Sequence, residues 1–301
     1  MEKLELEIKM SLCPITNNNM YDMYIIDSNK PKIKLPSGKS YLDVKKIVAH
    51  NNLHTICQSG NCPNLAECWG VGTATFMILG DICTRSCKFC SVTTGKPFPP
   101  DINEPQNIAN SVKQMKLKHC VITSVDRDDL PDGGATIWTE TVKKVKFENP
   151  QTTIEILIPD FKFDKKALNI VAESKPNIIS HNLETVERLS KKIRVQAKYQ
   201  RSLQVLNYIY IKGITTKSGI MLGLGETIEE IHKTMDDLLN VGCKIITIGQ
   251  YLQPTSNNIK VEKYYSSQEF KKLEEIALSK GFKFAECGSL IRSSYHAEKH
   301  V

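Results

Sequence analysis

The sequence predicts one α/β domain, a partial (β/α)6 barrel of the TIM-like kind with an N-terminal and a C-terminal extension. From Thr73 onward, short apolar runs alternate with amphipathic stretches, and this alternation indicates repeated βα units around a parallel sheet. The 301 residues, of which 41% are hydrophobic, can bury one sizeable core without a second globular domain. Because six strands follow one another, an open barrel is favoured over a closed one of eight strands.

The six predicted strands are short and mainly apolar, and six amphipathic segments alternate with them or follow the last one. The strands in chain order are Thr75–Leu79, Cys120–Thr123, Thr153–Ile158, Asn177–Ser180, Ser218–Leu222 and Ile245–Ile248. The predicted helices are Gln106–Met115, Ala135–Val145, Lys165–Ser174, Leu203–Ile211, Ile228–Val241 and Gln268–Ser279. Thr227 and Glu230 fit a capping box before the fifth helix, and Gly281 follows the sixth as a C-terminal stop.

The segments outside the barrel are assigned from their composition and cysteines. Most of Lys9 to Ser40, including Asn17-Asn18-Asn19, is polar and aperiodic, which predicts an irregular arm. The boundaries we predict are an N-terminal arm at 1–50, partly irregular, a cysteine-bearing segment at 51–72, the barrel at 73–286 and a C-terminal tail at 287–301.

Charge and cysteine content narrow the classes of function. The net charge of +7 includes lysine stretches such as Lys113 to Lys118, which lack interleaved aromatics and are typical of solvated helix faces. A mild positive field would equally suit an acidic protein partner. Ten cysteines in a chain of this length, with clustered spacing, indicate metal-bound thiolates in a reducing compartment rather than disulfides.

The N-terminal sequence and the hydropathy pattern bear on location. Met1 to Glu7 resembles neither a secretory signal nor an Arg-rich transit peptide. No apolar run reaches the roughly 18 residues that a membrane span needs. We therefore expect a soluble cytoplasmic protein, or alternatively one of an organelle matrix, with no membrane partner.

Cys83, Cys87 and Cys90 form the most informative motif, a cysteine triplet at x3 and x2 spacing directly after the first predicted strand. Thiolates are the usual protein ligands of iron–sulfur clusters, and three of them leave one iron of a four-iron cube open. An open iron can chelate S-adenosylmethionine (SAM) and pass it an electron, which splits SAM into methionine and a 5′-deoxyadenosyl radical that abstracts hydrogen. A zinc site is the alternative, but it normally takes four protein ligands in two close pairs.

Cys57, Cys62 and Cys68 form a second triplet, on a predicted loop before the first strand. By itself this wider spacing would also fit zinc or buried free cysteines, but beside the first triplet it indicates another cluster that lacks a fourth thiolate. The remaining cysteines are scattered, and those near strand starts are interpreted as small buried hydrophobes: Cys120 and Cys243.

Polar segments follow four further predicted strands, at the barrel end where active sites form. They are Asp126 to Gly134, His181 to Thr185, Gly223 to Thr227 and Gly249 to Pro254. The two glycines Gly223 and Gly225 are a weak signal for a phosphate loop and more typical of a tight βα turn.

Taken together, these motifs resemble the lipoyl synthase family of radical SAM enzymes, over roughly Leu42 to Glu298. The segments that carry the resemblance are the two cysteine triplets, Ala74 to Gly80, Thr123 to Leu130, His181 to Thr185, Thr216 to Thr227, Thr247 to Pro254 and Arg292 to Ala297. The triplets combined with Arg292-Ser293-Ser294-Tyr295 are much more specific than any single motif.

The resemblance implies the radical SAM type of partial barrel and two [4Fe–4S] clusters, with SAM as the third cofactor. Cys83, Cys87 and Cys90 would hold the SAM-binding cluster. Cys57, Cys62 and Cys68 would hold an auxiliary cluster whose fourth ligand is Ser294, and this cluster would be consumed as the sulfur donor. Without the family comparison, residues 292–295 would be interpreted as an ordinary polar C-terminus. A hydroxyl oxygen matches iron less well than a thiolate, which leaves an exchangeable corner.

The implied reaction is a sulfur transfer to carbons six and eight of an octanoyl chain on a carrier-protein lysine. We assign four side chains to the SAM or substrate pocket: Asp126, Arg127, Asn182 and Glu184. For each carboxylate the alternative is a helix N-cap or a surface ion pair. The implied partners are octanoylated acyltransferase subunits of 2-oxoacid dehydrogenases, the glycine cleavage H protein, and ferredoxin or flavodoxin as electron donor, but no nucleic acid.

Two rival functions follow from the same motifs. A biotin-synthase-like or methylthiolating radical SAM enzyme would lack the second triplet and the Arg292 to Tyr295 tail. A non-catalytic iron–sulfur electron carrier, or a zinc-stabilised binding protein, would have fully ligated metals and would not cleave SAM. Two incomplete triplets argue against this second rival.

Overall fold

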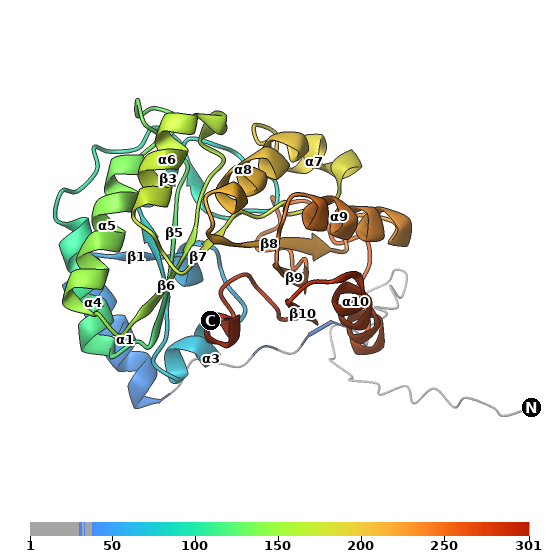
Figure 1. The fold of residues 1–301 in the computed structure, drawn as a ribbon. Helices are drawn as coiled ribbons and strands as arrows, with labels where there is room; N and C mark the ends of the chain where they lie inside the picture. Colours follow the sequence, from blue (N-terminus) through green and yellow to red (C-terminus); the bar gives the residue numbers. More distant parts are fainter. Residues whose placement is uncertain (1–29, 32, 34–37, 301) are drawn as a thin grey trace, which may run out of the picture.

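The computed structural model describes residues 30, 31, 33 and 38–300. Within this part of the chain, the central sheet has eight strands in the order β1-β2-β5-β6-β7-β8-β9-β10 (Figure 1). β2 to β10 run parallel in this order, and only β1 (His54–Thr55) is antiparallel, to β2. Because β1 and β10 end the sheet without pairing to each other, the barrel is open.

All six predicted strands are present, with ends that differ by a few residues. They are β2 (Thr75–Ile78), β5 (His119–Ser124), β6 (Thr153–Leu157), β7 (Ile178–Ser180), β8 (Thr215–Leu222) and β9 (Ile245–Gln250). A seventh parallel strand, β10 (Phe284–Gly288), pairs with β9. β10 was not predicted, because its five residues are all half-buried and include Glu286, so no apolar run marks it. Two-residue strands β3 (Ile82–Cys83) and β4 (Thr93–Thr94) pair with each other, and β3 contains the first cysteine of the first triplet.

The six predicted helices also form, and they lie along the outside of the sheet (Figure 1). They are α4 (Glu104–Met115), α5 (Ala135–Glu148), α6 (Lys165–Glu173), α8 (Tyr199–Ile211), α9 (Ile228–Asn240) and α10 (Ser267–Lys280). Thr227 and Glu230 form the expected capping box, and Gly281 ends α10 in the left-handed region at φ 113°. α7 (Glu187–Ile193) and the short helices η1 (Phe161–Phe163) and η2 (Ala297–His300) were not predicted.

The last part of the predicted arm forms α1 (Lys39–His50), which overlaps the stretch interpreted as irregular only at Lys39 and Ser40. Only Val44 and Val48 are buried on this helix, so its apolar face is too narrow to stand out in a lysine-rich sequence. Tyr41 packs on Trp69, with ring centroids 5.4 Å apart. The remainder of the arm prediction, including the asparagine tract, lies outside the described residues.

The interior of the open barrel is polar, while its apolar cores lie between sheet and helices. One core packs β2, β5 and β6 against α4 to α6, and the other packs β8 and β9 against α8 to α10. Three polar side chains from the neighbouring strands β6, β7 and β8 are fully buried: Glu155, Ser180 and Lys217. The C-terminal segment lies beside α3 and β10 (Figure 1). Among the described helices, none combines the length and the apolar character needed to cross a bilayer.

Candidate functional site

The first triplet lies on a short loop that begins at the end of β3. Backbone N–H groups point at its sulfurs: those of Arg85 and Asp126 lie 3.4 and 3.3 Å from Cys83 Sγ. The N–H of Val92 lies 3.4 Å from Cys90 Sγ. Such donors favour a thiolate over a thiol, so the backbone of this loop is suited to ionised cysteines.

The side chains of the first triplet are arranged for a strongly positive ligand. Burial, and next the charge of the nearby Asp126 carboxylate, raise the pKa of Cys83 to about 11. Burial and Asp126 likewise raise the pKa of Cys87 to about 12. Thiols in this setting ionise when a bound metal supplies the compensating charge. The donor set therefore fits an iron cluster.

The geometry of single-ion sites differs from that of a cube. Within residues 30–300 as described, no three His, Cys, Asp or Glu side chains converge closely enough to hold one metal ion. The thiolates of a four-iron cube each bind a different iron, so a cluster does not require such convergence.

A cavity of about 130 Å³ opens beside the first triplet. It is lined by Cys87 together with three of the four predicted pocket residues, Asp126, Asn182 and Glu184. Asn182 Oδ1 is buried and has no hydrogen-bond partner within the described part of the chain, while its Nδ2 donates to Ser293 Oγ at 2.7 Å. An unpaired buried acceptor at a cavity wall is costly without a ligand, so this atom fits a polar molecule in the cavity.

Arg127, the fourth predicted pocket residue, does not line the cavity. Its guanidinium donates to both carboxylate oxygens of Asp129 at 2.9 Å and to the Leu79 carbonyl at 3.1 Å. The side chain thus joins the loop after β5 to the end of β2. Arg127 therefore supports this loop, and its assignment to the SAM or substrate pocket stays a prediction.

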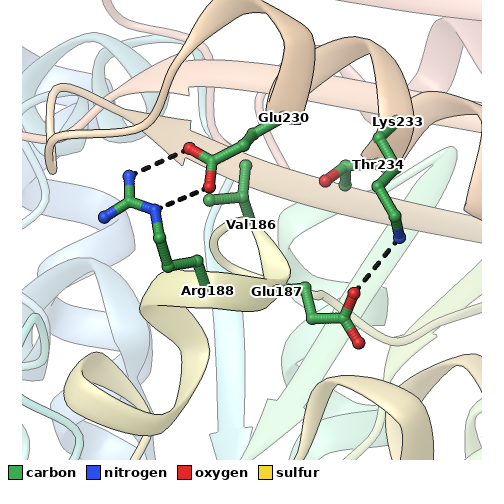
Figure 2. A pocket seen from close by; sticks show the side chains of 6 residues that line it. All are labelled: Val186, Glu187, Arg188, Glu230, Lys233 and Thr234. Atoms are coloured by element: carbon green, nitrogen blue, oxygen red, sulfur yellow. Dashed lines mark hydrogen bonds and ion pairs between the residues drawn. The ribbon is translucent and has the colours of Figure 1, made fainter.

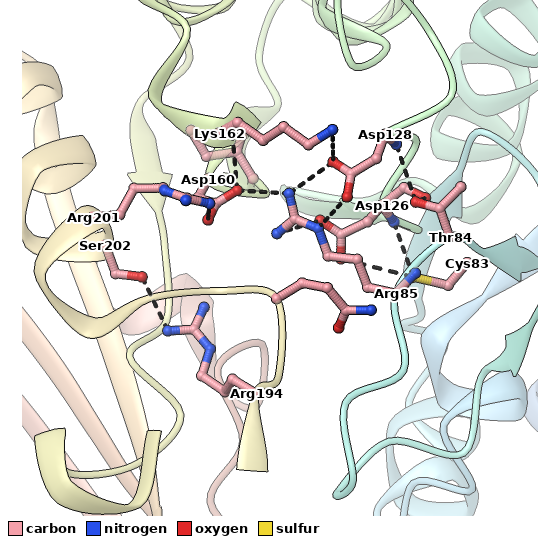
Figure 3. A network of polar contacts seen from close by, with 12 residues as sticks. Cys83, Thr84, Arg85, Asp126, Asp128, Asp160, Lys162, Arg194, Arg201 and Ser202 are labelled. Atoms are coloured by element: carbon pink, nitrogen blue, oxygen red, sulfur yellow. Dashed lines mark hydrogen bonds and ion pairs between the residues drawn. The ribbon is translucent and has the colours of Figure 1, made fainter. Parts of the chain in front are cut away.

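Arg85, which the sequence analysis did not single out, is the centre of a polar network under the triplet (Figure 3). Its side chain is 3% exposed and pairs with Asp126 at 3.2 Å, Asp128 at 2.8 Å and Asp160 at 2.8 Å. Arg201 also binds Asp160, at 3.1 Å. Burial alone would raise the pKa of Asp160, but the Arg85 charge and hydrogen bonds bring it to about 2. Arg85 therefore holds the cysteine loop against the segments that follow β5 and β6.

His181 forms part of the cavity wall as a neutral imidazole. Its Nδ1 lies 2.8 Å from the Ile158 carbonyl and therefore carries the hydrogen, while Nε2 accepts from Ser202 Oγ at 2.8 Å. Arg194 donates to the same Ser202 oxygen at 3.0 Å. Burial, and next the Arg194 charge, lower the pKa of His181 to about 4.

We expect the free energy of unfolding to fall between pH 6.5 and pH 4 because of His181. In this window the unfolded chain binds a proton at His181 and the folded chain does not, so acid favours unfolding. The resulting loss in the free energy of unfolding is about 2 kcal/mol by pH 5 and on the order of 3 kcal/mol below pH 4. Urea unfolding at several pH values measures it, and His181→Gln should show a flatter profile over this range. Identical profiles for the two proteins would contradict the prediction.

The second triplet lies mostly on short helices rather than on the predicted loop. Cys57 is in α2 (Ile56–Ser59) and Cys68 in α3 (Leu65–Gly70), while Cys62 lies in the turn between them. Burial, and then the charges of Cys57 and Cys62, raise the pKa of Cys68 to about 12. The three sulfurs are thus close enough to act on one another.

The C-terminal tail meets the second triplet on both sides of Ser294. Asn64 Nδ2 donates to the Leu290 carbonyl at 2.6 Å, and Tyr295 Oη donates to Glu67 Oε1 at 2.7 Å. The Arg292 guanidinium, whose pKa burial lowers, is near enough to both Cys62 and Glu184 for their charges to counter that shift. The segment 292–295 therefore lies between the second triplet and the cavity beside the first.

A second cavity, of about 270 Å³, lies away from the cysteines between α7 and α9 (Figure 2). Its charged side chains are paired with one another: Arg188 with Glu230 at 2.7 Å, and Lys233 with Glu187 at 3.2 Å. These pairs tie two outer helices together, so the cavity is interpreted as a groove of helix packing.

Comparison with known proteins bears on both the fold and the family. Residues 77–238 match the Radical SAM superfamily. Among solved structures, the FeFe-hydrogenase maturase HydG from Carboxydothermus hydrogenoformans has a TM-score of 0.56 at 13% identity, over 82% of this chain and 70% of that one. Methylornithine synthase (PylB) has a TM-score of 0.52 at 14% identity, over 84% and 78%. At such identities the likeness concerns the fold alone, and it confirms the predicted fold class.

Two curated relatives are much more similar in sequence. The lipoyl synthase of Bacteroides thetaiotaomicron is 56% identical over 270 residues, which are 90% of this chain and 96% of the relative. The mitochondrial lipoyl synthase of Nematostella vectensis is 54% identical over 276 residues, which are 90% of this chain and 95% of the relative. With this similarity over most of its length, the chain belongs to the lipoyl synthase family of the radical SAM superfamily.

Proposed function

We propose that this protein inserts two sulfur atoms, at carbons six and eight, into an octanoyl chain amide-linked to a lysine of a carrier protein, giving lipoyl-lysine. The observation that carries the proposal is the position of residues 292–295. Asn182 at the cavity binds Ser293, and Arg292 is within electrostatic reach of both Cys62 and Glu184. One short segment thus connects the cavity beside the first triplet with the second triplet. The proposed reaction requires such proximity, because the radical site and the sulfur source must act on the same acyl chain.

Cys83, Cys87 and Cys90 are proposed to hold a [4Fe–4S] cluster, with SAM in the adjoining cavity. When bound, this pair supplies a carbon radical that removes hydrogen from unactivated C–H bonds. The chain's own contribution is to hold and orient. Asp126, Asn182 and Glu184 line the cavity and are the polar groups for SAM or the acyl substrate. His181 is held neutral in the wall, where it offers no competing charge.

Cys57, Cys62 and Cys68 are proposed to hold the auxiliary [4Fe–4S] cluster, with Ser294 as its fourth ligand. Support comes from the tail contacts on both sides of Ser294, at Leu290 and Tyr295. A serine oxygen suits iron less well than a thiolate does. This corner can therefore exchange, which suits a cluster that gives up its sulfur.

The proposed partners follow from the substrate chemistry. They are octanoylated acyltransferase subunits of 2-oxoacid dehydrogenases and the glycine cleavage H protein, with ferredoxin or flavodoxin as the source of electrons. The cytoplasm is the proposed compartment and an organelle matrix the alternative. Relatives named as bacterial and as mitochondrial lipoyl synthases are compatible with either.

The test is to convert an octanoyl-lysyl peptide with protein reconstituted without oxygen. We expect about eight irons per chain, from two cubes, formation of 5′-deoxyadenosine, and a peptide that gains two sulfur atoms by mass. An acetyl-lysyl peptide is the matched control and should gain none. Deoxyadenosine without sulfur gain would overturn the lipoyl assignment and leave the radical one. Bound iron with no SAM cleavage would instead favour an electron carrier.

A further inference from the structure

We propose that Lys217 is a positioning residue, whose buried ammonium group holds the C-terminal tail in the barrel so that Ser294 stays at the second triplet. The inference rests on the proposed function, because it concerns the fourth ligand of the auxiliary site. Lys217 lies on β8, and its side chain is completely buried. A lysine in this position needs acceptors for all three N–H groups.

The acceptors of Lys217 come from two sources, the barrel wall and the tail. Its Nζ donates to Glu155 Oε2 on β6 at 3.0 Å and lies 2.9 Å from Oε1 of the same carboxylate. The other two acceptors are the Ser293 carbonyl, at 2.5 Å, and His300 Nδ1, at 3.2 Å. Two of the three hydrogen bonds of this ammonium therefore bind the tail, one of them at the residue next to Ser294.

The Glu155 carboxylate stabilises the charge of the buried Lys217 ammonium group by forming an ion pair with it. The carboxylate is completely buried and accepts from Ser180 Oγ at 2.7 Å. Burial alone would raise the pKa of Glu155, but the Lys217 charge, the nearby His119 imidazole and hydrogen bonds from Lys217 and Ser180 bring it to about 2. The pair thus remains ionised, and its remaining hydrogen-bonding capacity is directed at the tail.

The tail has other anchors, but they lie on different parts of the molecule. Asn64 and Glu67 hold Leu290 and Tyr295 to the segment that carries the second triplet itself. Lys217 holds Ser293 to the barrel strands instead, and Asn182 adds a neutral hydrogen bond to Ser293 Oγ, at 2.7 Å, from the loop after β7. Without Lys217, the tail would lose its charge-assisted bonds to the barrel, and the bond from Asn182 would hold it there less firmly than the contacts to the triplet segment do. The ammonium therefore sets the position of Ser294 with respect to the SAM cavity.

The test uses the double variant Lys217→Met with Glu155→Gln, which removes both charges and leaves neither buried alone. Amide hydrogen exchange is measured on the full chain, before and after cluster reconstitution. We expect exchange in residues 289–300 to rise about tenfold or more, because charge-assisted hydrogen bonds are lost there. Exchange in β5 to β9 should stay as in the unmodified protein. The matched control is the exposed pair Lys113 and Glu148, changed to Met and Gln, which should alter nothing in the tail.

His300→Ala is the second variant, for the case in which the double variant unfolds. It removes one tail acceptor and leaves the Glu155–Lys217 pair intact, so a smaller rise in the same peptides is expected. Unchanged exchange in the tail of a folded variant would overturn the inference.

Product analysis separates a positioning role from a purely structural one. In the reconstituted double variant, SAM cleavage should continue at its normal rate while sulfur transfer to the octanoyl peptide falls about tenfold or more. A parallel loss of both activities would overturn the positioning role. If the unmodified protein transfers no sulfur, the proposed function fails, and the exchange experiment still decides whether Lys217 holds the tail.

Discussion

Alanine at Cys57 is expected to leave SAM cleavage intact while the octanoyl peptide gains no sulfur. Cys57 is buried in α2 and is within electrostatic reach of Cys62 and Cys68. Its loss leaves the second triplet with two thiolates, too few to hold a cube. The first triplet, on the loop after β3, keeps its ligands and its backbone donors. Iron content should therefore fall from about eight to about four per chain.

Alanine at Cys87 should abolish SAM cleavage and sulfur transfer together. Cys87 lines the cavity beside the first triplet, and without its thiolate the proposed SAM-binding cluster and its radical should both be lost. We expect neither deoxyadenosine nor sulfur gain, although about four irons should remain at the second triplet. Mass spectrometry of the peptide and chromatography of deoxyadenosine measure both steps in the same reaction.

Cys120→Ala is the matched control for both cysteine variants. Cys120 is completely buried in β5, and burial is the sole cause of its raised pKa, so it belongs to neither triplet. This variant should keep about eight irons and both products. If the Cys57 and Cys87 variants lost SAM cleavage equally, the division of labour between the triplets would be wrong.

The parts of the site that the sequence predicts are those defined by local spacing. Cys83, Cys87 and Cys90 lie within eight residues, and the strand before them is an unbroken apolar run, so motif and barrel position could be predicted together. Asp126, Asn182 and Glu184 were placed in one pocket because residues after parallel strands meet at one end of a barrel. The three side chains line one cavity, and their contact with SAM or substrate stays a prediction.

The parts that the sequence does not predict depend on contacts between distant residues. Arg127 follows Asp126 directly in the loop after β5, but the side chains of adjacent residues point in different directions. The Arg127 guanidinium donates to Asp129 and to the Leu79 carbonyl. Lys217 resembles any lysine in a sequence with 40 basic residues. Lys217 can be buried because it pairs with Glu155, which lies 62 positions away in the sequence, and the hydrophobic periodicity gives no sign of such a pair. β10 was missed for a related reason, because a half-buried edge strand lacks the apolar signal of a central one.

Arg85→Gln is expected to destabilise the protein strongly, by about 3–5 kcal/mol in the free energy of unfolding at pH 7. The reason is the environment of the guanidinium, which is 3% exposed and faces Asp126, Asp128 and Asp160. Glutamine leaves these three carboxylates close together without the one cation that they share, while Arg201 still pairs with Asp160 and Lys162 with Asp128. Removal of one partner from a buried ion pair leaves the other charge uncompensated.

Acid should reduce the loss of stability caused by Arg85→Gln, and the direction of this pH dependence follows from the pKa of Asp160. In the unmodified protein Arg85 holds that pKa near 2, so the ion pair stabilises the fold above the ordinary carboxylate range and this stabilisation is lost as pH falls toward 2. In the variant the clustered carboxylates have raised pKa values and are neutralised first. The stability difference between the two proteins should therefore be smaller at pH 4 than at pH 7.

Arg188→Gln provides the matched control, because Arg188 makes the same bidentate contact with a carboxylate at the surface. It binds Glu230 through Nε at 2.7 Å and Nη2 at 2.9 Å, but its side chain is 55% exposed (Figure 2). Water replaces the lost contact there, so little or no change in stability is expected. Urea titrations of both variants and the unmodified protein compare the two sites directly. Equal effects would mean that burial does not govern these pairs, and Arg85 would then lose its role as the support of the cysteine loop.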